Sequence, residues 1–184
     1  MDFIETITLT GQRQYILAAI HHARRGARVL GTTAHPTHAW VTQAIKNLVM
    51  DLEDAGQLTA IKFMIRDRDA KYPVVIDEIL SQAGIRTVLT AVRTPRMNSI
   101  MERWVRSLRR EVLDRALLWN EAHLRRALRE YEQHDNHHRT HRTPQAAAPL
   151  RVVPEPLNPP QSKHLRVRRH DRLGGVLHEY RHAS

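Results

Sequence analysis

Hydrophobic and polar residues alternate at the start of the chain. Over residues 3–9, the odd positions Phe3, Glu5, Ile7 and Leu9 share one face and the even positions share the other, which is typical of a β-strand. An apolar run follows over residues 15–20, and a polar connection separates it from a third short strand expected over residues 27–33. Because short connections join antiparallel neighbours, this pattern predicts a three-strand meander.

The spacing of apolar residues then changes. Trp40, Ala44, Leu48 and Leu52 recur every four positions after Pro36, which predicts a helix. Further along we expect a strand, a helix, a strand and two helices, at residues 60–66, 73–83, 85–89, 99–113 and 120–138. Strand–helix–strand units imply parallel pairing by right-handed crossovers. The predicted fold class is therefore α/β, a five-stranded mixed sheet flanked by helices.

The C-terminal part has a different character. We expect the core to cover residues 1–145, a proline-rich linker to cover 146–162 and a basic tail to cover 163–184, since clustered prolines favour an extended spacer. Within the tail, Gly174-Gly175 is compatible with a short strand pair.

Composition narrows the class of protein. Hydrophobic residues make up 41% and charged residues 26% of the 184 residues, which fits a folded chain rather than a disordered one. There is no cysteine, so disulfides and thiolate zinc sites are excluded. No apolar run is long enough for a membrane helix and no secretory signal opens the chain. The net charge of +10, mostly from arginine, favours a nucleic-acid partner over a merely solvated basic surface.

Three carboxylates stand at informative positions. Glu5 lies on an otherwise apolar strand face, where a carboxylate needs a partner or a cation, unless it reaches solvent near the chain start. Asp67 follows the strand at 60–66, at the edge where open sheets place ligands; the alternative is a solvated charged turn. Asp69 competes with Asp67 for the same role.

Glu102 opens the helix that begins near residue 99. Its alternatives are a capping box with Ser99 and an ion pair with Arg106 one turn later. In the predicted topology Glu5, Asp67 and Glu102 become neighbours, and carboxylate oxygens are ligands that hard divalent cations prefer. Two such cations can promote phosphodiester chemistry without a side-chain nucleophile.

The segments around these acids resemble the three acidic motifs of the retroviral-integrase superfamily, most closely those of integrase-core transposases of bacterial insertion sequences. The motifs are Phe3-Ile4-Glu5-Thr6, residues 65–72 (Ile-Arg-Asp-Arg-Asp-Ala-Lys-Tyr) and residues 94–103, with Asp67 and Glu102 separated by about the family's usual gap. Residues 136–142 are similar to the family's Tyr-Asn-x-x-Arg-Pro-His segment, with Asp135 replacing the tyrosine and Thr140 the proline. Residues 173–180 carry a looser likeness.

The resemblance implies a ribonuclease-H-like catalytic core that transfers DNA strands by attack of a DNA 3′-hydroxyl. It implies a two-metal site of Mg²⁺ or Mn²⁺, with Glu5, Asp67 and Glu102 as both catalytic acids and metal ligands. The implied partners are the DNA of the element ends and of the target, and further copies of the chain, since such transposases act as multimers. A cytoplasmic, nucleoid-associated location without membrane contact follows from these partners.

Two departures from the family pattern change the expectation. Position 5 carries glutamate where the family has aspartate, and an added methylene displaces the carboxylate by far more than metal-ligand distances tolerate. We therefore expect impaired activity. Met1 also stands just before the first acid, so we expect the helical DNA-binding region of such transposases to be missing, as in a fragment, a domesticated remnant or a split gene.

The candidate DNA contacts are polar or basic residues beside the acidic motifs. They are Arg66, Arg68, Lys71, Arg96, Asn98, Arg103, Arg106, Arg109, Arg110 and Arg139. Residues 103, 106 and 110 form one stripe of the helix that begins at Glu102, and we expect them to bind phosphates; the alternative is a solvated face shared with Glu111 and Asp114.

Two further groups remain open. The tail arginines Arg166, Arg168, Arg169 and Arg172 either extend the DNA-binding surface or belong to a disordered tail. His134, His137 and His141 have a spacing compatible with zinc on one helical face, but no fourth ligand accompanies them, which favours phosphate or carboxylate partners.

Three functions are consistent with these observations. The first is a metal-dependent DNA integrase or transposase, active or degenerate. The second is a non-catalytic DNA-binding remnant of a transposase, which would bind DNA in a salt-sensitive way without needing the acids. The third is a ribonuclease-H-like nuclease acting on hybrids, which shares fold and chemistry with the first.

Overall fold

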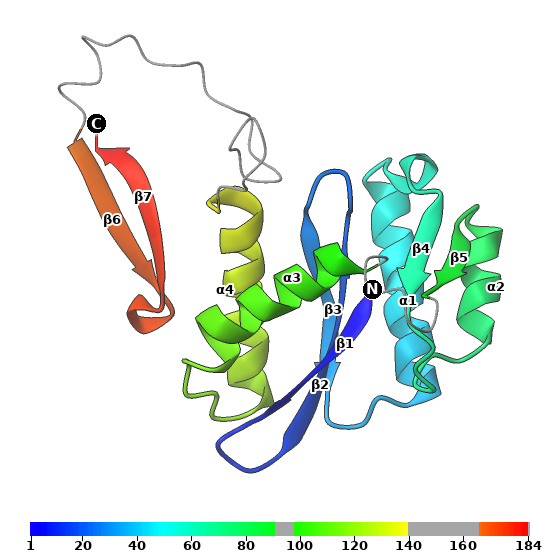
Figure 1. Ribbon diagram of the computed structural model, residues 1–184, viewed down its shortest axis with the longest axis horizontal. Coiled ribbons are helices and arrows are strands. Elements are labelled where there is room, and N and C mark those ends of the chain that lie inside the picture. Colours follow the sequence, from blue (N-terminus) through cyan, green and yellow to red (C-terminus); the bar gives the residue numbers. More distant parts are fainter. Residues whose placement is uncertain (91–97, 140–165, 184) are drawn as a thin grey trace, which may run out of the picture.

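A computed structural model describes residues 1–90, 98–139 and 166–183, and its elements follow the expected order (Figure 1). The strands are β1 Asp2–Ile7, β2 Arg13–Ile20, β3 Ala27–Thr33, β4 Phe63–Arg66, β5 Arg86–Leu89, β6 Arg166–Arg172 and β7 Leu177–Ala183. The α-helices are α1 His38–Asp54, α2 Val75–Gln82, α3 Ser99–Leu108 and α4 Glu121–His137. The expected strand start at residue 60 is wrong, because Leu58–Ala60 forms a 3₁₀ turn and β4 begins only at Phe63.

The strands pair as the sequence predicts. β1, β2 and β3 form an antiparallel meander, with Ile4 opposite Ile16 and Leu17 opposite Gly31. β4 and β5 pair in parallel. The expected five-stranded sheet is built from these two ladders rather than one continuous ladder. They meet where the N-terminal ammonium of Met1 donates a hydrogen bond of 2.8 Å to the Ile65 carbonyl oxygen.

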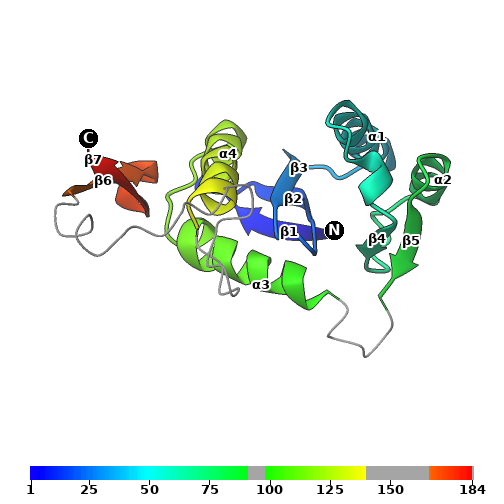
Figure 2. The same ribbon diagram turned by 90° about the horizontal axis from the view of Figure 1, so that it is seen from above.

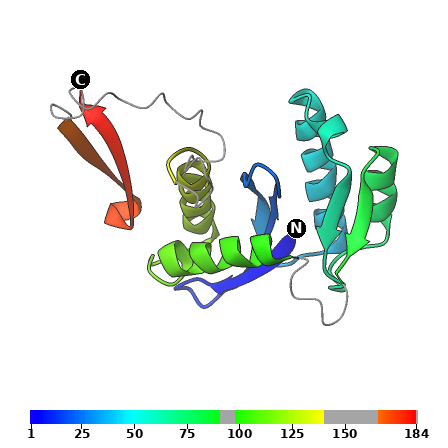
Figure 3. The same ribbon diagram turned by 45° about the horizontal axis from the view of Figure 1, so that its top comes forward.

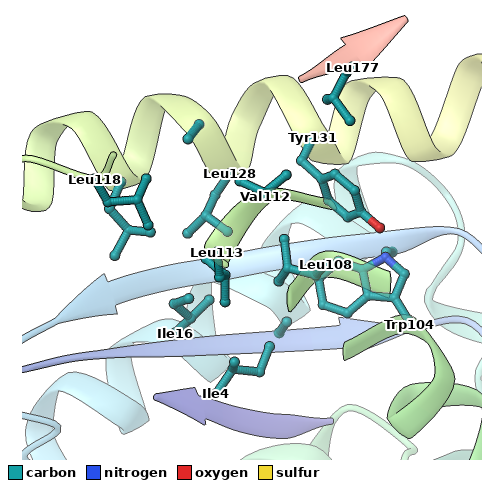
Figure 4. Packing of buried hydrophobic residues seen from close by; sticks show 14 of the residues in the cluster. Ile4, Ile16, Trp104, Leu108, Val112, Leu113, Leu118, Leu128, Tyr131 and Leu177 are labelled. Atoms are coloured by element: carbon teal, nitrogen blue, oxygen red, sulfur yellow. The ribbon is translucent and has the colours of Figure 1, made fainter. Parts of the chain in front are cut away.

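The meander separates two hydrophobic cores. On one face, Ile4 and Ile16 pack with residues of α3 and α4 (Figure 4). On the other face, Met1 and Leu17 pack with residues of α1, α2 and β4. Because successive side chains of a strand point to opposite faces, the neighbours Ile16 and Leu17 enter different cores. Figure 2 shows α4 and α1 on opposite sides of the meander.

Helix α1 has a clear sequence basis. The Thr37 hydroxyl accepts a hydrogen bond from the Trp40 amide and caps the helix, as threonine does at this position. Gly31 on β3 makes room for Trp40, since a Cβ there would lie only 3.0 Å from the indole ring. Trp40 is therefore a packing residue between α1 and the meander.

Helix α3 continues into a π-helical turn, η2, over Arg109–Leu113. Together they span the helix predicted over residues 99–113. Their buried face carries Met101, Trp104 and Leu108, spaced three and four residues apart as an amphipathic helix requires. This face fixes which side of α3 meets the sheet.

The C-terminal tail forms an antiparallel hairpin of β6 and β7, as the glycine pair suggested (Figure 3). Leu177 of β7 is buried and belongs to the same core as Tyr131 of α4. The predicted linker 146–162 lies outside the described residues. Within the described part of the chain, no helix combines the length and apolar character needed to cross a membrane.

Candidate active site

Asp67 lies immediately after β4, at the carboxyl end of a parallel strand, as the sequence predicts. It is partly buried, and its Oδ1 accepts a long hydrogen bond of 3.4 Å from the Asp69 amide. Asp69 instead forms an ion pair with Lys71, whose Nζ lies 2.7 Å from Asp69 Oδ2. The Lys71 amide also donates a hydrogen bond of 2.9 Å to Asp69 Oδ1. Partial burial opposes ionisation of Asp69, but hydrogen bonds and charge from Lys71 outweigh it and lower its pKa. Of the two aspartates, Asp67 is the one without a cationic side-chain partner among the described residues.

Glu102 lies in the first turn of α3 and its side chain is exposed. The capping box expected with Ser99 is not formed, because the helix begins at Ser99 itself and its N-cap Asn98 makes no side-chain capping bond. A carboxylate in the first turn is stabilised by the positive end of the helix dipole. Glu102 is therefore held near the N-terminus of α3 with a solvent-facing carboxylate.

Asp2 is a further acid at this sheet edge, for which the sequence pattern predicted no role. The hydrogen bond from Met1 to Ile65 places the start of β1 against the end of β4, and the N-terminus lies near the start of α3 in Figures 1 and 3. Burial raises the pKa of Asp2, the charge of Asp67 and, more weakly, that of Glu102 raise it further, and the Phe3 amide and N-terminal ammonium oppose this. The charges of Asp67, just after β4, and of Glu102 on α3 thus both act on Asp2 at the start of β1.

Glu5 lies elsewhere. Ile4 packs toward α3, and alternation along a strand gives Asp2 the same face and Glu5 the opposite one. The Glu5 side chain is 45% exposed and forms weak ion pairs with Arg13 at 3.5 Å and Lys71 at 3.9 Å. The expected convergence of Glu5 with Asp67 and Glu102 therefore finds no support in this arrangement. The sequence signal for Asp2 is its spacing from Ile4. Because Asp2 lies two positions before this core residue, both side chains point to the same face of β1.

The donor set around Asp2 suits a hard divalent cation. Carboxylate oxygens are its preferred ligands, and a cation between the acids would offset the repulsion that the charges of Asp67 and Glu102 exert on Asp2. Nearby, the buried Tyr72 hydroxyl has no hydrogen-bond partner among the described residues, and burial raises its pKa with further contributions from the charges of Asp67 and Asp2. An orphaned buried hydroxyl is a common sign of an ion or water at a site.

The carboxylates are nevertheless not gathered into a ready-made cluster. Over residues 1–90, 98–139 and 166–183, no three histidine, aspartate or glutamate side chains lie close enough together to hold a metal ion. Cation binding by Asp2, Asp67 and Glu102 would need side-chain movements that bring their oxygens nearer. The exposed Glu102, on the first turn of its helix, has room for such movement.

Basic residues border the acids. Arg103 and Arg106 are exposed on α3 next to Glu102, and no ion pair involves either within the described residues. Arg68 is exposed beyond Asp67 and its Nε donates to the Thr90 carbonyl oxygen at 3.4 Å. These side chains keep donors available for phosphates.

Lys71, Arg109 and Arg110 are more engaged. Lys71 lies over the rings of Phe3 and Tyr15. Arg109 Nη2 donates to the Glu5 carbonyl oxygen at 2.9 Å and so fixes η2 to β1. Arg110 pairs with its neighbour Glu111 at 3.1 Å. All three remain candidate DNA contacts.

Three of the expected DNA contacts are less accessible, because two of them form ion pairs within the fold and the third is buried. Arg66 is buried and its guanidinium holds Asp77 through Nη2 at 2.8 Å and the Asp67 carbonyl oxygen through Nη1 at 3.1 Å, which leaves no exposed fork for a phosphate. Asn98 is buried at the start of α3. Arg139 binds Glu111 bidentately, at 2.6 and 2.9 Å. Arg96 lies outside the described residues.

The segment from Asp135 to Arg139 fastens α4 to the rest of the core. Buried Asp135 accepts a hydrogen bond of 3.0 Å from the Trp104 indole, and Asn136 bonds to the backbone of Ala27. The sequence presented these residues as part of a family motif, and in the structure they make tertiary contacts. The available sequence signal was the unbroken run of polar residues at the C-terminal end of α4. Where such residues become buried, they must find hydrogen-bond partners in the rest of the fold.

The histidines of α4 are also explained by packing. His134 and His138 lie 3.9 and 3.6 Å from a carboxylate oxygen of Glu179 on β7, and His137 contacts the Gln133 carbonyl oxygen. This agrees with the carboxylate partners preferred over zinc. His141 lies outside the described residues.

The arrangement of strands and helices defines a fold class, the ribonuclease-H-like fold. A sequence model of the Integrase core domain family matches residues 83–149. The catalytic core domain of BIV integrase aligns at 14% identity over 89% of this chain and 94% of its own, with a TM-score of 0.54. The chain of the simian T-cell lymphotropic virus intasome in complex with PP2A regulatory subunit B56 gamma aligns at 14% identity over 100% of this chain and 66% of its own, with a TM-score of 0.56.

No curated protein matches the sequence. Residues 83–149 are thus similar to the Integrase core domain family, and the fold of the chain is similar to that of retroviral integrase catalytic cores. This confirms the fold class and the resemblance to integrase cores. It supports a function of the integrase or transposase type.

Proposed function

We propose that this chain is the catalytic domain of a DNA integrase or transposase that uses Asp2, Asp67 and Glu102 as its acidic triad. The observation that supports the proposal is the position of the start of β1, which lies against the end of β4 through the hydrogen bond from Met1 to Ile65 and near the start of α3 (Figures 1 and 3). Burial, and then the charges of Asp67 and Glu102, raise the pKa of Asp2 there. The assignment replaces Glu5 by an aspartate on the face of β1 that meets α3. The reason for expecting impaired activity, a glutamate at the first acidic position, then no longer applies.

Asp2, Asp67 and Glu102 would hold Mg²⁺ or Mn²⁺. Such cations, when bound, activate an attacking hydroxyl and stabilise the leaving oxygen of a phosphodiester. The protein's own residues position these groups: Arg66 braces the segment after β4 through Asp77 and the Asp67 carbonyl, and the start of α3 carries Glu102. Arg103, Arg106 and Arg68 would bind the phosphates that flank the reacting one.

The proposed substrates are the ends of a mobile DNA element and a target DNA, with self-association on paired ends and a cytoplasmic location at the nucleoid. The net charge of +10 supports a polyanionic partner. A hydroxyl of DNA rather than water as the attacking group distinguishes this proposal from a nuclease that cleaves hybrids.

Strand transfer with Mg²⁺ or Mn²⁺ tests the triad. Joining of a labelled duplex to plasmid DNA should fall at least ~100-fold in Asp2→Asn, Asp67→Asn and Glu102→Gln, beyond the 10–100-fold typical of outer-shell metal partners. Glu5→Gln is the matched control and should retain activity. Loss of activity in Glu5→Gln with retention in Asp2→Asn would return the first acid to position 5.

A non-catalytic DNA-binding protein remains the second candidate, favoured by the absence of a ready-made metal cluster over the described residues. It predicts DNA binding without nicking or joining under any metal condition, and binding unchanged by Asp67→Asn. Cleavage of an RNA–DNA hybrid without joining of DNA would instead identify a ribonuclease.

A further inference from the structure

The β6–β7 hairpin carries exposed arginines that the candidate active site does not use. Every described side chain from Arg166 to Asp171 is exposed, whereas Leu177 and Glu179 on β7 are 4% and 3% exposed. The hairpin therefore has a fixed inner portion and a charged outer portion. A disordered basic tail, one of the two alternatives left open by the sequence, does not describe residues 166–183.

The inner portion is anchored to α4 by packing and charge. Leu177 joins the core around Tyr131 (Figure 4). Glu179 forms an ion pair with Arg172 on the neighbouring strand at 3.3 Å and approaches His138 at 3.6 Å. The ion pair with Arg172 lies within the hairpin, so the hairpin is held against α4 by the burial of Leu177 and by the contacts of Glu179 with the two histidines.

The register of the hairpin places the arginines beyond this anchor. Arg172 is opposite Leu177 and His170 is opposite Glu179, whereas Arg168 and Arg166 are opposite Arg181 and Ala183 farther from the turn. Glu179 already lies at the last turn of α4, beside His134 and His138. The strand ends bearing Arg166 and Arg168 therefore continue past the end of the helix (Figure 1).

The charge of this overhang is not balanced within the described residues. Arg169 pairs with Asp171 at 3.0 Å, but no acidic partner contacts Arg166 or Arg168 in the described part of the chain. A bound polyanion would neutralise the charge of Arg166 and Arg168, and the guanidinium group matches a phosphate in shape.

We propose that the overhanging end of the β6–β7 hairpin is a second DNA-binding surface, which holds the phosphodiester backbone through Arg166 and Arg168. The partner rests on the proposed function, which supplies DNA as the substrate. Arginine contacts to phosphates carry no sequence information, so this surface would hold the substrate without selecting its sequence. The exposed Tyr180, opposite Arg169, offers a hydroxyl donor beside them.

The test is the salt dependence of binding to a duplex oligonucleotide, measured by fluorescence anisotropy with the full chain in EDTA, so that catalysis plays no part. The double variant Arg166→Gln/Arg168→Gln should lower the slope of log K against log salt by about 2, roughly one per phosphate contact. Its affinity at moderate salt should fall about tenfold or more. Both side chains are exposed, so the melting temperature should not change.

Lys46→Gln/Lys62→Gln removes the same charge from exposed positions near α1 and β4 and should leave the slope near the wild-type value. Arg166→Lys/Arg168→Lys should keep the slope, because charge is retained. A hairpin variant that binds like the Lys46/Lys62 control overturns the proposal while leaving the proposed function standing. Wild-type protein that fails to bind DNA at all overturns both. Loss of binding to vesicles of anionic lipid, with DNA binding unchanged, would also overturn it.

Discussion

Asn136 on α4 forms two hydrogen bonds with the backbone of Ala27 at the start of β3. Its Nδ2 donates to the Ala27 carbonyl oxygen at 2.8 Å, and its Oδ1 accepts from the Ala27 amide at 2.9 Å. The amide side chain thus replaces a neighbouring strand at the edge of the meander. Both groups are buried, so each would be left unsatisfied without the other.

Replacing Asn136 should cost considerable stability. In Asn136→Ala the Ala27 amide and carbonyl lose their partners in a buried setting, and each orphaned group costs about 1–3 kcal/mol. We expect urea unfolding to show a loss of about 2–4 kcal/mol. Asn47→Ala, at an exposed position of α1, should change stability by less than about 0.5 kcal/mol. A loss in Asn136→Ala no larger than in Asn47→Ala would contradict this role.

Arg139 and Arg106 should show opposite behaviour. Arg139 bridges α4 and η2 through Glu111 and also donates to the Tyr131 hydroxyl at 3.2 Å, so Arg139→Gln should destabilise the protein by about 1–3 kcal/mol with little change in the salt dependence of DNA binding. Arg106 is exposed, so Arg106→Gln should leave stability unchanged and lower the slope by about 1. Chemical denaturation and anisotropy titrations on both variants separate the two effects. The reverse pattern would return Arg139 to the DNA-binding surface.

Cation binding should stabilise the protein through Asp2 and not through Glu5. A ligand that binds the folded state alone raises stability by about 2.7 kcal/mol at one hundred times its Kd. Titration with Mn²⁺ should therefore raise the melting temperature of the wild type and of Glu5→Gln, and should do so much less in Asp2→Asn and Asp67→Asn. Equal stabilisation of all four proteins would show that the metal binds elsewhere.

His134 should make the attachment of the hairpin sensitive to pH. Burial lowers the pKa of His134, although the Glu179 carboxylate opposes this, and His138 and Arg139 lower it further. Since the unfolded state then binds the proton more tightly, the contribution of neutral His134 to stability is fully present above the ordinary pKa of about 6.5. This contribution is lost as the pH falls below that value and through the lower pKa of the folded state.

The melting temperature of the wild type should accordingly drop more steeply between pH 7 and pH 5 than that of His134→Gln. His137→Gln changes an exposed histidine of the same helix and should retain the wild-type profile. Parallel profiles in all three proteins would show that His134 does not contribute to the pH dependence.

The sequence by itself determined the order of elements and the places of Asp67 and Glu102 among them. Alternation gave the meander, spacing of three and four gave the helices, and turn residues placed Asp67 after a parallel strand and Glu102 at a helix start. These features depend on neighbours within a few positions of each residue, so local periodicity and capping preferences suffice to predict them. The tail hairpin was indicated for the same reason.

Tertiary structure decided which residues face each other. Both faces of β1 carry apolar side chains, so the alternation could not show whether Asp2 or Glu5 points toward α3; that follows from Ile4 entering the core of α3 and α4. Likewise Arg66, Asn136 and Arg139 have partners 11 to 109 residues away. Such partnerships depend on long-range packing, because the local pattern of a charged or polar residue is the same whether it faces solvent or a buried acceptor.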